Sequence, residues 1–144
     1  MDAIICFTRV PKAGQTKTRL MPCLTGEQCA ELHWAFLRDL GKIYDSMKAD
    51  LLVAHTQDPD WEQLKAVFPA ARFFPQEGKD LGEKMNHALN LVLSMGYEKC
   101  ILTGSDLPLM TKAHETNIKP FTFRQTGKQL FKIGIQPICH GYFV

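Results

Sequence analysis

This sequence lacks a long apolar run and a paired cysteine pattern, and each absence argues against particular classes of protein. The longest apolar run near the start covers only residues 3–7, whereas a signal peptide needs an apolar core of about 7–15 residues and a membrane span about 20. The five cysteines are an odd number and no two have CxxC spacing, which disfavours a disulfide framework and a zinc knuckle. We therefore expect a cytoplasmic protein with no membrane partner.

A large excess of one charge is also missing. The 17 Lys and Arg residues nearly balance the 15 Asp and Glu residues, which leaves a net charge of +2. That excess is too small to argue for a nucleic-acid partner or a membrane-surface patch. With 45% hydrophobic and 22% charged residues, the composition is typical of a globular protein and excludes disorder. The chain has 144 residues, and we expect residues 1–144 to form a single domain.

Short apolar segments alternate with segments of helical period. The apolar segments predict strands at residues 3–7, 50–56, 72–74 and 99–103. The helical segments lie at residues 26–47, 60–68 and 81–95. Weaker patterns suggest a helical turn at residues 111–117 and a last strand at residues 130–135. This alternation predicts an α/β fold with a parallel sheet covered on both faces, in which a ligand binds beyond the carboxyl ends of the strands.

The first predicted helix has the clearest signals. Thr25 is a candidate N-cap, and Gln28 three residues later completes a capping box. Apolar residues then recur at spacings of three and four, which predicts the buried face of an amphipathic helix. These residues are Cys29, Leu32, Phe36, Leu40, Ile43 and Met47.

The loop after the first predicted strand is basic. It lies in the segment FTRVPKAGQTKTRL, residues 7–20, and carries Arg9, Lys12, Lys17 and Arg19 around Gly14. Cations beside a glycine-containing turn suit a polyphosphate, because lysine supplies a point charge, arginine a fork of donors and the turn free N–H groups. The motif is neither a P-loop nor GxGxxG. The alternative is a basic turn that only faces water.

An acidic turn follows the predicted strand at residues 99–103. Residues 104–108 read GSDLP, and Asp106 would project from the carboxyl edge of the sheet towards the basic loop. A lone carboxylate there can hold Mg²⁺ or Mn²⁺, with substrate phosphates and waters as the other ligands. The alternative is that Asp106 caps the following turn. Taken together, the two loops predict a site for a nucleotide diphosphate or triphosphate.

Other reactive side chains carry weaker signals. His33 and His87 lie on predicted helices, where we expect surface or core-edge positions, and His55 ends a predicted strand. Cys6 and Cys100 are expected to pack within strands. No Gly-x-Ser-x-Gly elbow is present, which leaves serine hydrolase chemistry without support.

Three segments resemble a known family. FTRVPKAGQTKTRL, the loop at residues 76–82 leading into EKM, and LTGSDLPLMT resemble the small bacterial GT-A-like transferases of the DUF2064 group, over about residues 1–112. The resemblance implies a Rossmann-like α/β/α sandwich of the nucleotide-diphospho-sugar transferase (GT-A) type. It implies that Lys17 and Arg19 lie over the phosphates of a nucleotide and that Asp106 binds the metal. It also implies that the second loop lines the nucleotide crevice, through Gln76, Gly78, Leu81 and Gly82.

The sequence departs from this family near its end. Relatives carry a GP-x-x-DGGY-like motif where residues 134–142 read GIQPICHGY, so that Cys139 stands in place of the acidic residue. We expect a C-terminally truncated domain, whose uncovered sheet edge a homodimer would cover. The sequence alone identifies no catalytic residue.

The resemblance implies a metal-dependent transferase that moves a sugar from a nucleotide-activated donor to a small-molecule acceptor. The alternatives are a nucleotidyltransferase, similar to the phospholactate guanylyltransferases and the molybdenum-cofactor enzymes, and a catalytically inactive nucleotide-binding remnant.

Overall fold

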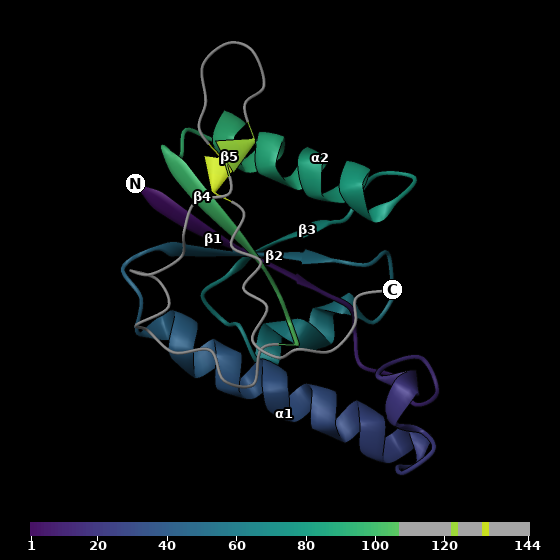
Figure 1. Ribbon diagram of the computed structural model, residues 1–144. Helices are drawn as coiled ribbons and strands as arrows, with labels where there is room; N and C mark the ends of the chain where they lie inside the picture. The colour runs from purple at the N-terminus through teal and green to yellow at the C-terminus, as the bar shows by residue number, and fades with distance from the viewer. Residues whose placement is uncertain (107–121, 124–130, 133–144) are drawn as a thin grey trace.

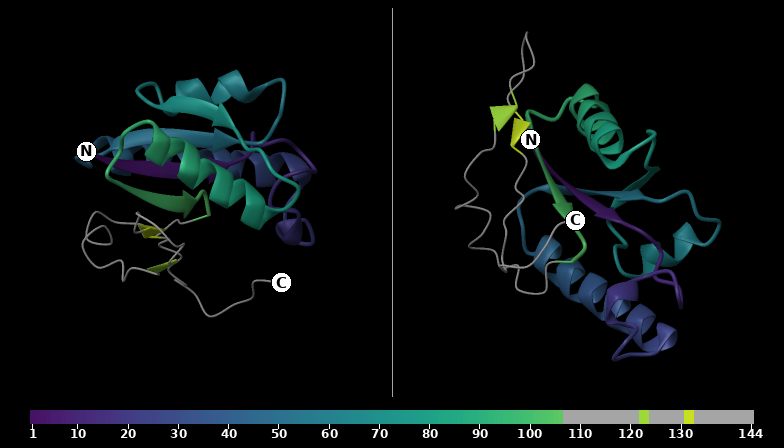
Figure 2. Two further views of the ribbon diagram at one scale, coloured as in Figure 1. Left: turned by 90° about the horizontal axis from the view of Figure 1, so that it is seen from above. Right: turned by 45° about the vertical axis from the view of Figure 1, so that its right-hand side comes forward.

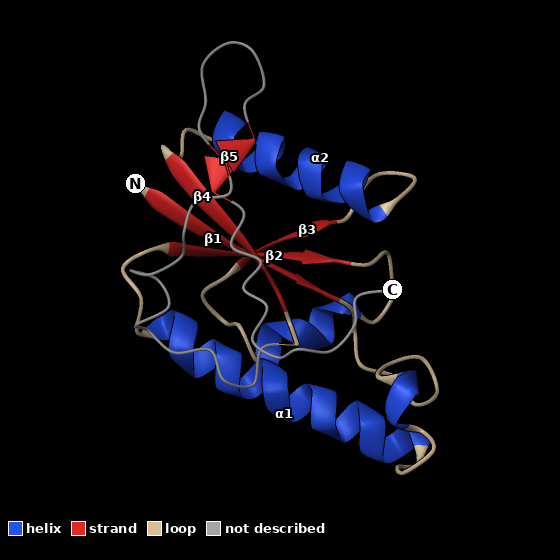
Figure 3. Cartoon of the chain, in the orientation of Figure 1, coloured by secondary structure: helices blue, strands red, loops and turns tan. Residues whose placement is uncertain are grey.

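A parallel sheet forms the centre of the molecule. The computed structural model describes residues 1–106, 122–123 and 131–132. Within them, the strands are β1 (Asp2–Thr8), β2 (Asp50–His55), β3 (Arg72–Pro75), β4 (Lys99–Gly104), β5 (Thr122–Phe123) and β6 (Phe131–Lys132). The sheet order is β3-β2-β1-β4-β6-β5, and every neighbouring pair is parallel except β5 with β6. The predicted α/β class and the four predicted strands within residues 1–106 are confirmed (Figure 3).

Helices cover both faces of this sheet. Helix α1 (Gly26–Asp45) and the 3-10 helix η2 (Trp61–Ala66) lie on one face, and α2 (Leu81–Ser94) lies on the other (Figures 1 and 2). A second 3-10 helix, η1 (Thr18–Leu20), follows the basic loop. None of the helices within the described part of the chain has the length and apolarity that crossing a membrane requires.

The predicted capping box begins α1. The backbone N–H of Gln28 donates to Thr25 Oγ1 over 3.2 Å, and the N–H of Thr25 donates to Gln28 Oε1 over 2.9 Å. The helix ends at Asp45 instead of at residue 47, and Met47 packs into the core from the turn that follows. The segment predicted as a helix at residues 60–68 is the shorter η2.

The buried face of α1 differs from the predicted one. It consists of Cys29, His33, Leu37, Leu40, Gly41 and Tyr44. Leu32, Phe36 and Ile43 are only half-buried. Ile43 still packs against the core beneath this face, whereas the prediction missed His33 and Tyr44, whose polar atoms find buried partners and can therefore leave water.

Two hydrophobic cores sandwich the sheet. Ile5 on β1 belongs to the core beneath α2, with Leu52, Leu89 and Val92. Its neighbours Ile4 and Cys6 point to the other face and pack with residues of α1 and η2. Because successive side chains of a strand alternate between faces, a strand segment buried on both sides must be apolar throughout, as residues 3–7 of β1 are.

The cysteines of the strands are buried as predicted. Cys6 on β1 and Cys100 on β4 are both within the cores. Burial raises the pKa of Cys6 to about 12 and that of Cys100 to about 11, so neither thiol is a nucleophile near neutral pH.

Several predictions for the C-terminal part fall outside the described residues. These are the helical turn at residues 111–117 and the departure at residues 134–142, including Cys139. Of the last predicted strand, residues 130–135, the structure describes β6, which pairs with β4.

Candidate functional site

The basic loop and the acidic turn leave the same edge of the sheet. Strands β1 and β4 are parallel neighbours, and Phe7 stands opposite Gly104 in their register. Both strands therefore end together, and the chain that follows each of them leaves the sheet at the same place. Lys17 from the basic loop and Asp106 from the acidic turn form an ion pair there, across 89 positions of sequence. The structure thus brings together the two residues on which the sequence prediction most depends.

Lys17 is held in an unusual conformation. Its φ of 48° makes it the single non-glycine residue with a positive φ in the described part of the chain, and a left-handed conformation costs an L-residue about 1–2 kcal/mol. The Lys17 side chain is only 11% exposed, and its Nζ lies 4.3 Å from the centre of the Phe36 ring on α1. The contact with the Phe36 ring therefore helps to hold the Lys17 ammonium beside Asp106.

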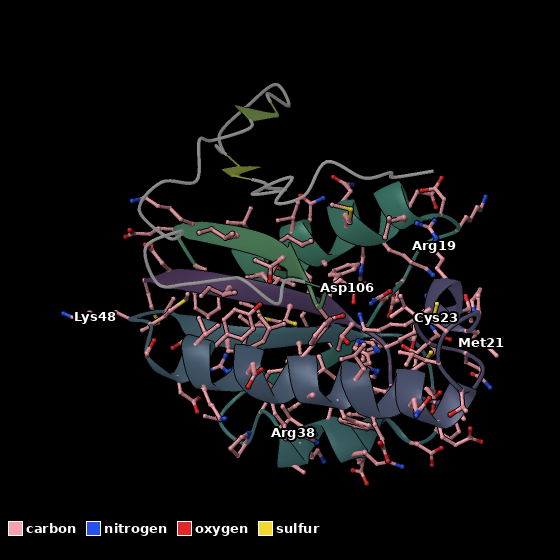
Figure 4. The ribbon with its side chains drawn as sticks, turned by 60° about the horizontal axis from the view of Figure 1, so that its bottom comes forward. Arg19, Met21, Cys23, Arg38, Lys48 and Asp106 are labelled. Atoms are coloured by element: carbon pink, nitrogen blue, oxygen red, sulfur yellow. The ribbon has the colours of Figure 1, made fainter. Side chains whose placement is uncertain are left out.

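Asp106 is the accessible partner of this pair. Its side chain is 73% exposed, and Figure 4 shows it at the end of β4. No group of three or more His, Cys, Asp or Glu side chains suited to a metal ion occurs among the described residues. A single exposed carboxylate does not form a metal cage of its own. It fits a Mg²⁺ or Mn²⁺ ion that takes its remaining ligands from phosphates and waters.

A buried histidine lies beside the ion pair. His33 on α1 is 3% exposed, whereas the sequence placed it at the surface or at the core edge. Its Nδ1 is 2.5 Å from Thr16 Oγ1 and its Nε2 is 3.1 Å from Ser105 Oγ. Burial lowers the pKa of His33 to about 4, the Asp106 carboxylate opposes this shift, and nearby Lys17 and Arg9 add to it. The ring is therefore neutral near pH 7.

The other predicted phosphate-binding cations have different surroundings. Lys12 Nζ lies 2.8 Å from Asp58 Oδ1 and 2.7 Å from Asp60 Oδ2, and these hydrogen bonds raise the pKa of Lys12. Arg9 Nη1 donates to the carbonyl of Gln15 over 3.1 Å. Arg19 lies in η1, which follows the basic loop. Figure 4 shows it at the opposite end of the molecule from Lys48.

The missing side chain of Gly26 allows the basic loop to approach α1 closely, because a Cβ there would lie only 2.8 Å from the backbone nitrogen of Gly14. Gly14 itself has a φ of +74°, a left-handed conformation that favours glycine. Gly26 is the first residue of α1. The loop backbone is therefore packed against the start of α1, which limits how far its cations can move.

The second predicted loop is held by the ends of β1 and β2 and by contacts within its own turn. Gln76 is buried, and its Nε2 donates to the carbonyls of Thr8 and Ala54 over 3.1 and 2.8 Å. This amide group bridges the ends of β1 and β2. A Cβ on Gly78, whose φ is +145°, would lie 2.7 Å from the backbone nitrogen of Lys84. Glycine is thus required at this position by the fold itself.

The start of α2 completes this loop. Asp80 is the N-cap, and its Oδ1 accepts a hydrogen bond from the N–H of Glu83 over 2.8 Å. Leu81 is 59% exposed, and a Cβ on Gly82 would lie 3.3 Å from Asp80 Oδ1. Whether these residues line a nucleotide crevice stays a prediction, since each of their described contacts serves the turn.

His33, Thr16 and Ser105 are the residues of this site that the sequence reasoning missed. Thr16 and Ser105 directly precede Lys17 and Asp106. A signal was present in α1, because His33 has helical spacing with Cys29, Leu37 and Leu40. A histidine at the inward face of a helix needs polar partners, and neighbours of the two candidate loops could have supplied them.

The comparisons with known proteins concern the family and the fold of the chain. The profile of DUF2064, described as an uncharacterized protein conserved in bacteria, matches residues 39–117. The solved "putative nucleotide-diphospho-sugar transferase" from Desulfovibrio desulfuricans G20 shares 32% sequence identity, with a TM-score of 0.75 over 81% of this chain and 52% of that one. This chain therefore spans about half the length of that protein.

A more distant structure shares the fold. The crystal structure of 4-diphosphocytidyl-2C-methyl-D-erythritol synthase matches with a TM-score of 0.54 and 14% identity, over 82% of this chain and 53% of that one. No functionally curated protein matches. The expected fold of the nucleotide-diphospho-sugar transferase type is confirmed. The profile match covers more than half of the residues, and the chain belongs to the DUF2064 family.

Proposed function

We propose that this chain carries the nucleotide-binding part of a metal-dependent transferase, which moves a sugar from a nucleotide-activated donor to a small-molecule acceptor. The observation that carries the proposal is the meeting of Lys17 and Asp106 at the shared carboxyl edge of β1 and β4. In open α/β sheets this edge is where ligands bind. The similarity to a protein described as a nucleotide-diphospho-sugar transferase points in the same direction.

The chemistry of this reaction suits the charges of the site. An acceptor nucleophile attacks the anomeric carbon of the donor sugar, and the nucleotide diphosphate leaves with the bonding electrons. Lys17 and Arg19 would stabilise the negative charge that builds on the diphosphate. Asp106 would hold Mg²⁺ or Mn²⁺, which when bound supplies further stabilisation of the same oxygens.

The ion pair also predicts how ligands bind. In the structure described here, the Lys17 ammonium neutralises the Asp106 carboxylate. A phosphate that binds Lys17 frees Asp106 for a cation, and a cation that binds Asp106 frees Lys17 for a phosphate. Each ligand thus removes an obstacle to the other, and we expect the metal and the nucleotide to bind cooperatively.

The second candidate reaction is nucleotidyl transfer. An acceptor phosphate would attack the α-phosphate of a nucleoside triphosphate, and pyrophosphate would leave, with Lys17 and Asp106 in the same roles. The two reactions differ in the leaving group, so product analysis separates nucleoside diphosphate release from pyrophosphate release. A chain that binds the nucleotide but turns over neither donor would be the inactive remnant.

The test is a thermal-shift titration with UDP, GDP, CDP, UTP, GTP and CTP, each with and without Mn²⁺. A ligand that binds only the native state raises the melting temperature by mass action. We expect a Mn²⁺-dependent shift with one base, which Asp106→Ala abolishes and Lys17→Met strongly reduces.

Lys12→Met is the matched control for Lys17→Met. It removes an equal charge from the same loop, but from an ammonium that already lies between Asp58 and Asp60. We expect the ligand-induced shift to survive in this variant. A cooperatively melting wild-type protein that responds to none of the six nucleotides would overturn the proposed function.

A further inference from the structure

Three buried polar side chains from three elements meet beside the Lys17–Asp106 pair. Thr16 comes from the basic loop, His33 from α1 and Ser105 from the turn after β4, and they are 2%, 3% and 8% exposed. The His33 ring lies between the two hydroxyl groups, with Nδ1 at 2.5 Å from Thr16 Oγ1 and Nε2 at 3.1 Å from Ser105 Oγ. A buried polar chain of this kind is stable only when every member has a partner.

The ring satisfies both hydroxyl groups because it is neutral. A neutral imidazole has one N–H donor and one acceptor nitrogen, and a hydroxyl group can serve as either. Burial lowers the pKa of His33 to about 4, so this arrangement persists at neutral pH. One ring nitrogen donates to one hydroxyl group, while the other nitrogen accepts from the second.

The two hydroxyl groups that His33 contacts lie next to the charged residues of the site. Thr16 directly precedes Lys17, and Ser105 directly precedes Asp106. One side chain of α1 therefore fixes the residue before each member of the ion pair. Phe36, three residues after His33 on the same helix, lies under the Lys17 ammonium at 4.3 Å. Helix α1 thus holds the basic loop at two points.

A second buried hydrogen bond of α1, made by Tyr44, serves as a control for the contacts of His33. Tyr44 is also on the buried face of α1, and its hydroxyl group lies 2.7 Å from Thr103 Oγ1 on β4. Like the contact between His33 and Ser105, this is a buried hydrogen bond that joins α1 to the chain of β4. It differs because it reaches a residue within the strand and has no link to the basic loop.

We propose that His33 is a positioning residue, which holds Thr16 and Ser105 and thereby keeps Lys17 and Asp106 side by side, where one can take a phosphate and the other a metal ion. The inference rests on the proposed function and deepens it, because it names what sets the geometry of the pair.

The first test measures the Mn²⁺-dependent enhancement of nucleotide affinity. This quantity is the Kd for the responding nucleoside diphosphate without Mn²⁺ divided by its Kd with Mn²⁺, taken from calorimetry on the full chain. Instability alone weakens both Kd values by the same factor and leaves their ratio unchanged. A misplaced Lys17–Asp106 pair lowers the ratio, since the two ligands no longer meet.

Three variants remove the bridge in different ways, and a fourth, Tyr44→Phe, is the control. His33→Gln replaces the ring, while Thr16→Val and Ser105→Ala each remove one of its partners with little loss of volume. We expect each to lower the enhancement about fivefold, the factor that one ordinary hydrogen bond contributes. Tyr44→Phe is expected to lower stability and to leave the enhancement within about twofold of the wild type. An undiminished enhancement in all three bridge variants overturns the proposal.

A second measurement needs no ligand and separates the two proposals. The backbone N–H groups of Leu20 and Met21 donate to the carbonyls of Lys17 and Thr18 over 2.9 and 3.1 Å, and their hydrogen exchange reports how firmly the loop is held. We expect His33→Gln to accelerate this exchange about fivefold, with no change in Tyr44→Phe.

The two experiments fail in different ways. A wild-type chain that binds no nucleotide refutes the proposed function, and the exchange measurement then decides on the bridge alone. A wild-type chain that binds the nucleotide with Mn²⁺, together with variants that exchange and bind like it, refutes the role of His33.

Discussion

The buried His33 ring makes the stability of this protein depend on pH in a calculable way. Burial lowers the pKa of His33 to about 4 in the folded state, whereas an unfolded histidine has a pKa of about 6.5. As the pH falls below about 6.5, the unfolded chain takes up a proton that the folded chain refuses. The free energy of unfolding therefore decreases as the pH falls from about 6.5 to about 4. Below about pH 4 the contribution of His33 to stability is fully lost.

The size of this effect follows from the shift. A displacement of about 2.5 pKa units corresponds to about 3 kcal/mol at the acidic limit. Between about pH 7.5 and pH 5, the linkage relation gives a loss of about 2 kcal/mol from His33 alone. This is a large share of the stability of an ordinary domain, which is about 5–15 kcal/mol.

Urea unfolding of the wild type and of His33→Gln at a series of pH values isolates this contribution. Glutamine does not titrate, while ionisable groups that make no contact with the ring, such as the Lys12–Asp58 pair, contribute to both proteins alike. We expect the wild type to lose about 2 kcal/mol more than the variant between about pH 7.5 and pH 5. Parallel pH profiles for the two proteins would refute the assignment of His33 as a buried, neutral ring.

Three further predictions concern the scaffold. Gly78→Ala should lower the free energy of unfolding by more than about 1 kcal/mol, because its new Cβ meets the Lys84 backbone at 2.7 Å and its φ is +145°; urea unfolding at neutral pH checks this, and an unchanged midpoint would contradict it. Leu37→Ala, at a fully buried site on α1, should cost about 2–5 kcal/mol in the same assay, and a cost below about 1 kcal/mol would show that the site is not packed as described. Iodoacetamide at about pH 8 should label the exposed Cys23 in the native protein and spare Cys6, since burial raises the pKa of Cys6 to about 12; mass spectrometry of the digested protein reads this out, and early labelling of Cys6 would count against the buried strand.

Local sequence signals were sufficient for most of the fold. Apolar runs located the strands because a parallel sheet is buried on both faces, and β2 differs from its predicted range by one residue. The Thr25–Gln28 capping box located the start of α1 because both of its hydrogen bonds are local. The end of the same helix was misplaced because Met47 continues the apolar period from outside the helix.

The site was predictable only where strand geometry determines it. The basic loop and the acidic turn were expected to converge because the strands of a parallel sheet end at one edge, and Lys17 and Asp106 form an ion pair there. The bridge through His33 was not predicted, because its partners lie 17 and 72 residues away and have no characteristic spacing. Threonine and serine are common, so only the tertiary structure shows which of them meet the ring.

Gln76 shows that a residue assigned to a binding site from its sequence can also have a structural role. The family resemblance implied that it lines the nucleotide crevice, and its side chain amide donates to two strand-end carbonyls. A polar residue at the mouth of a site can be there because the backbone of the strands needs donors. Sequence patterns cannot separate these two causes, since both place the same residue at the same strand end.

Helix α1 links the stability of one face of the sheet to the geometry of the site. Its buried face carries Leu37 and Leu40 in the core, His33 at the site and Tyr44, whose hydroxyl group contacts Thr103 of β4. Protein interiors are densely packed, so a shift of α1 against the sheet moves the contacts of these four residues together. Helix α2, on the other face, packs through Val92 and Leu89 and carries none of the described contacts of the Lys17–Asp106 pair. Alignment of the two charges therefore depends on one core far more than on the other.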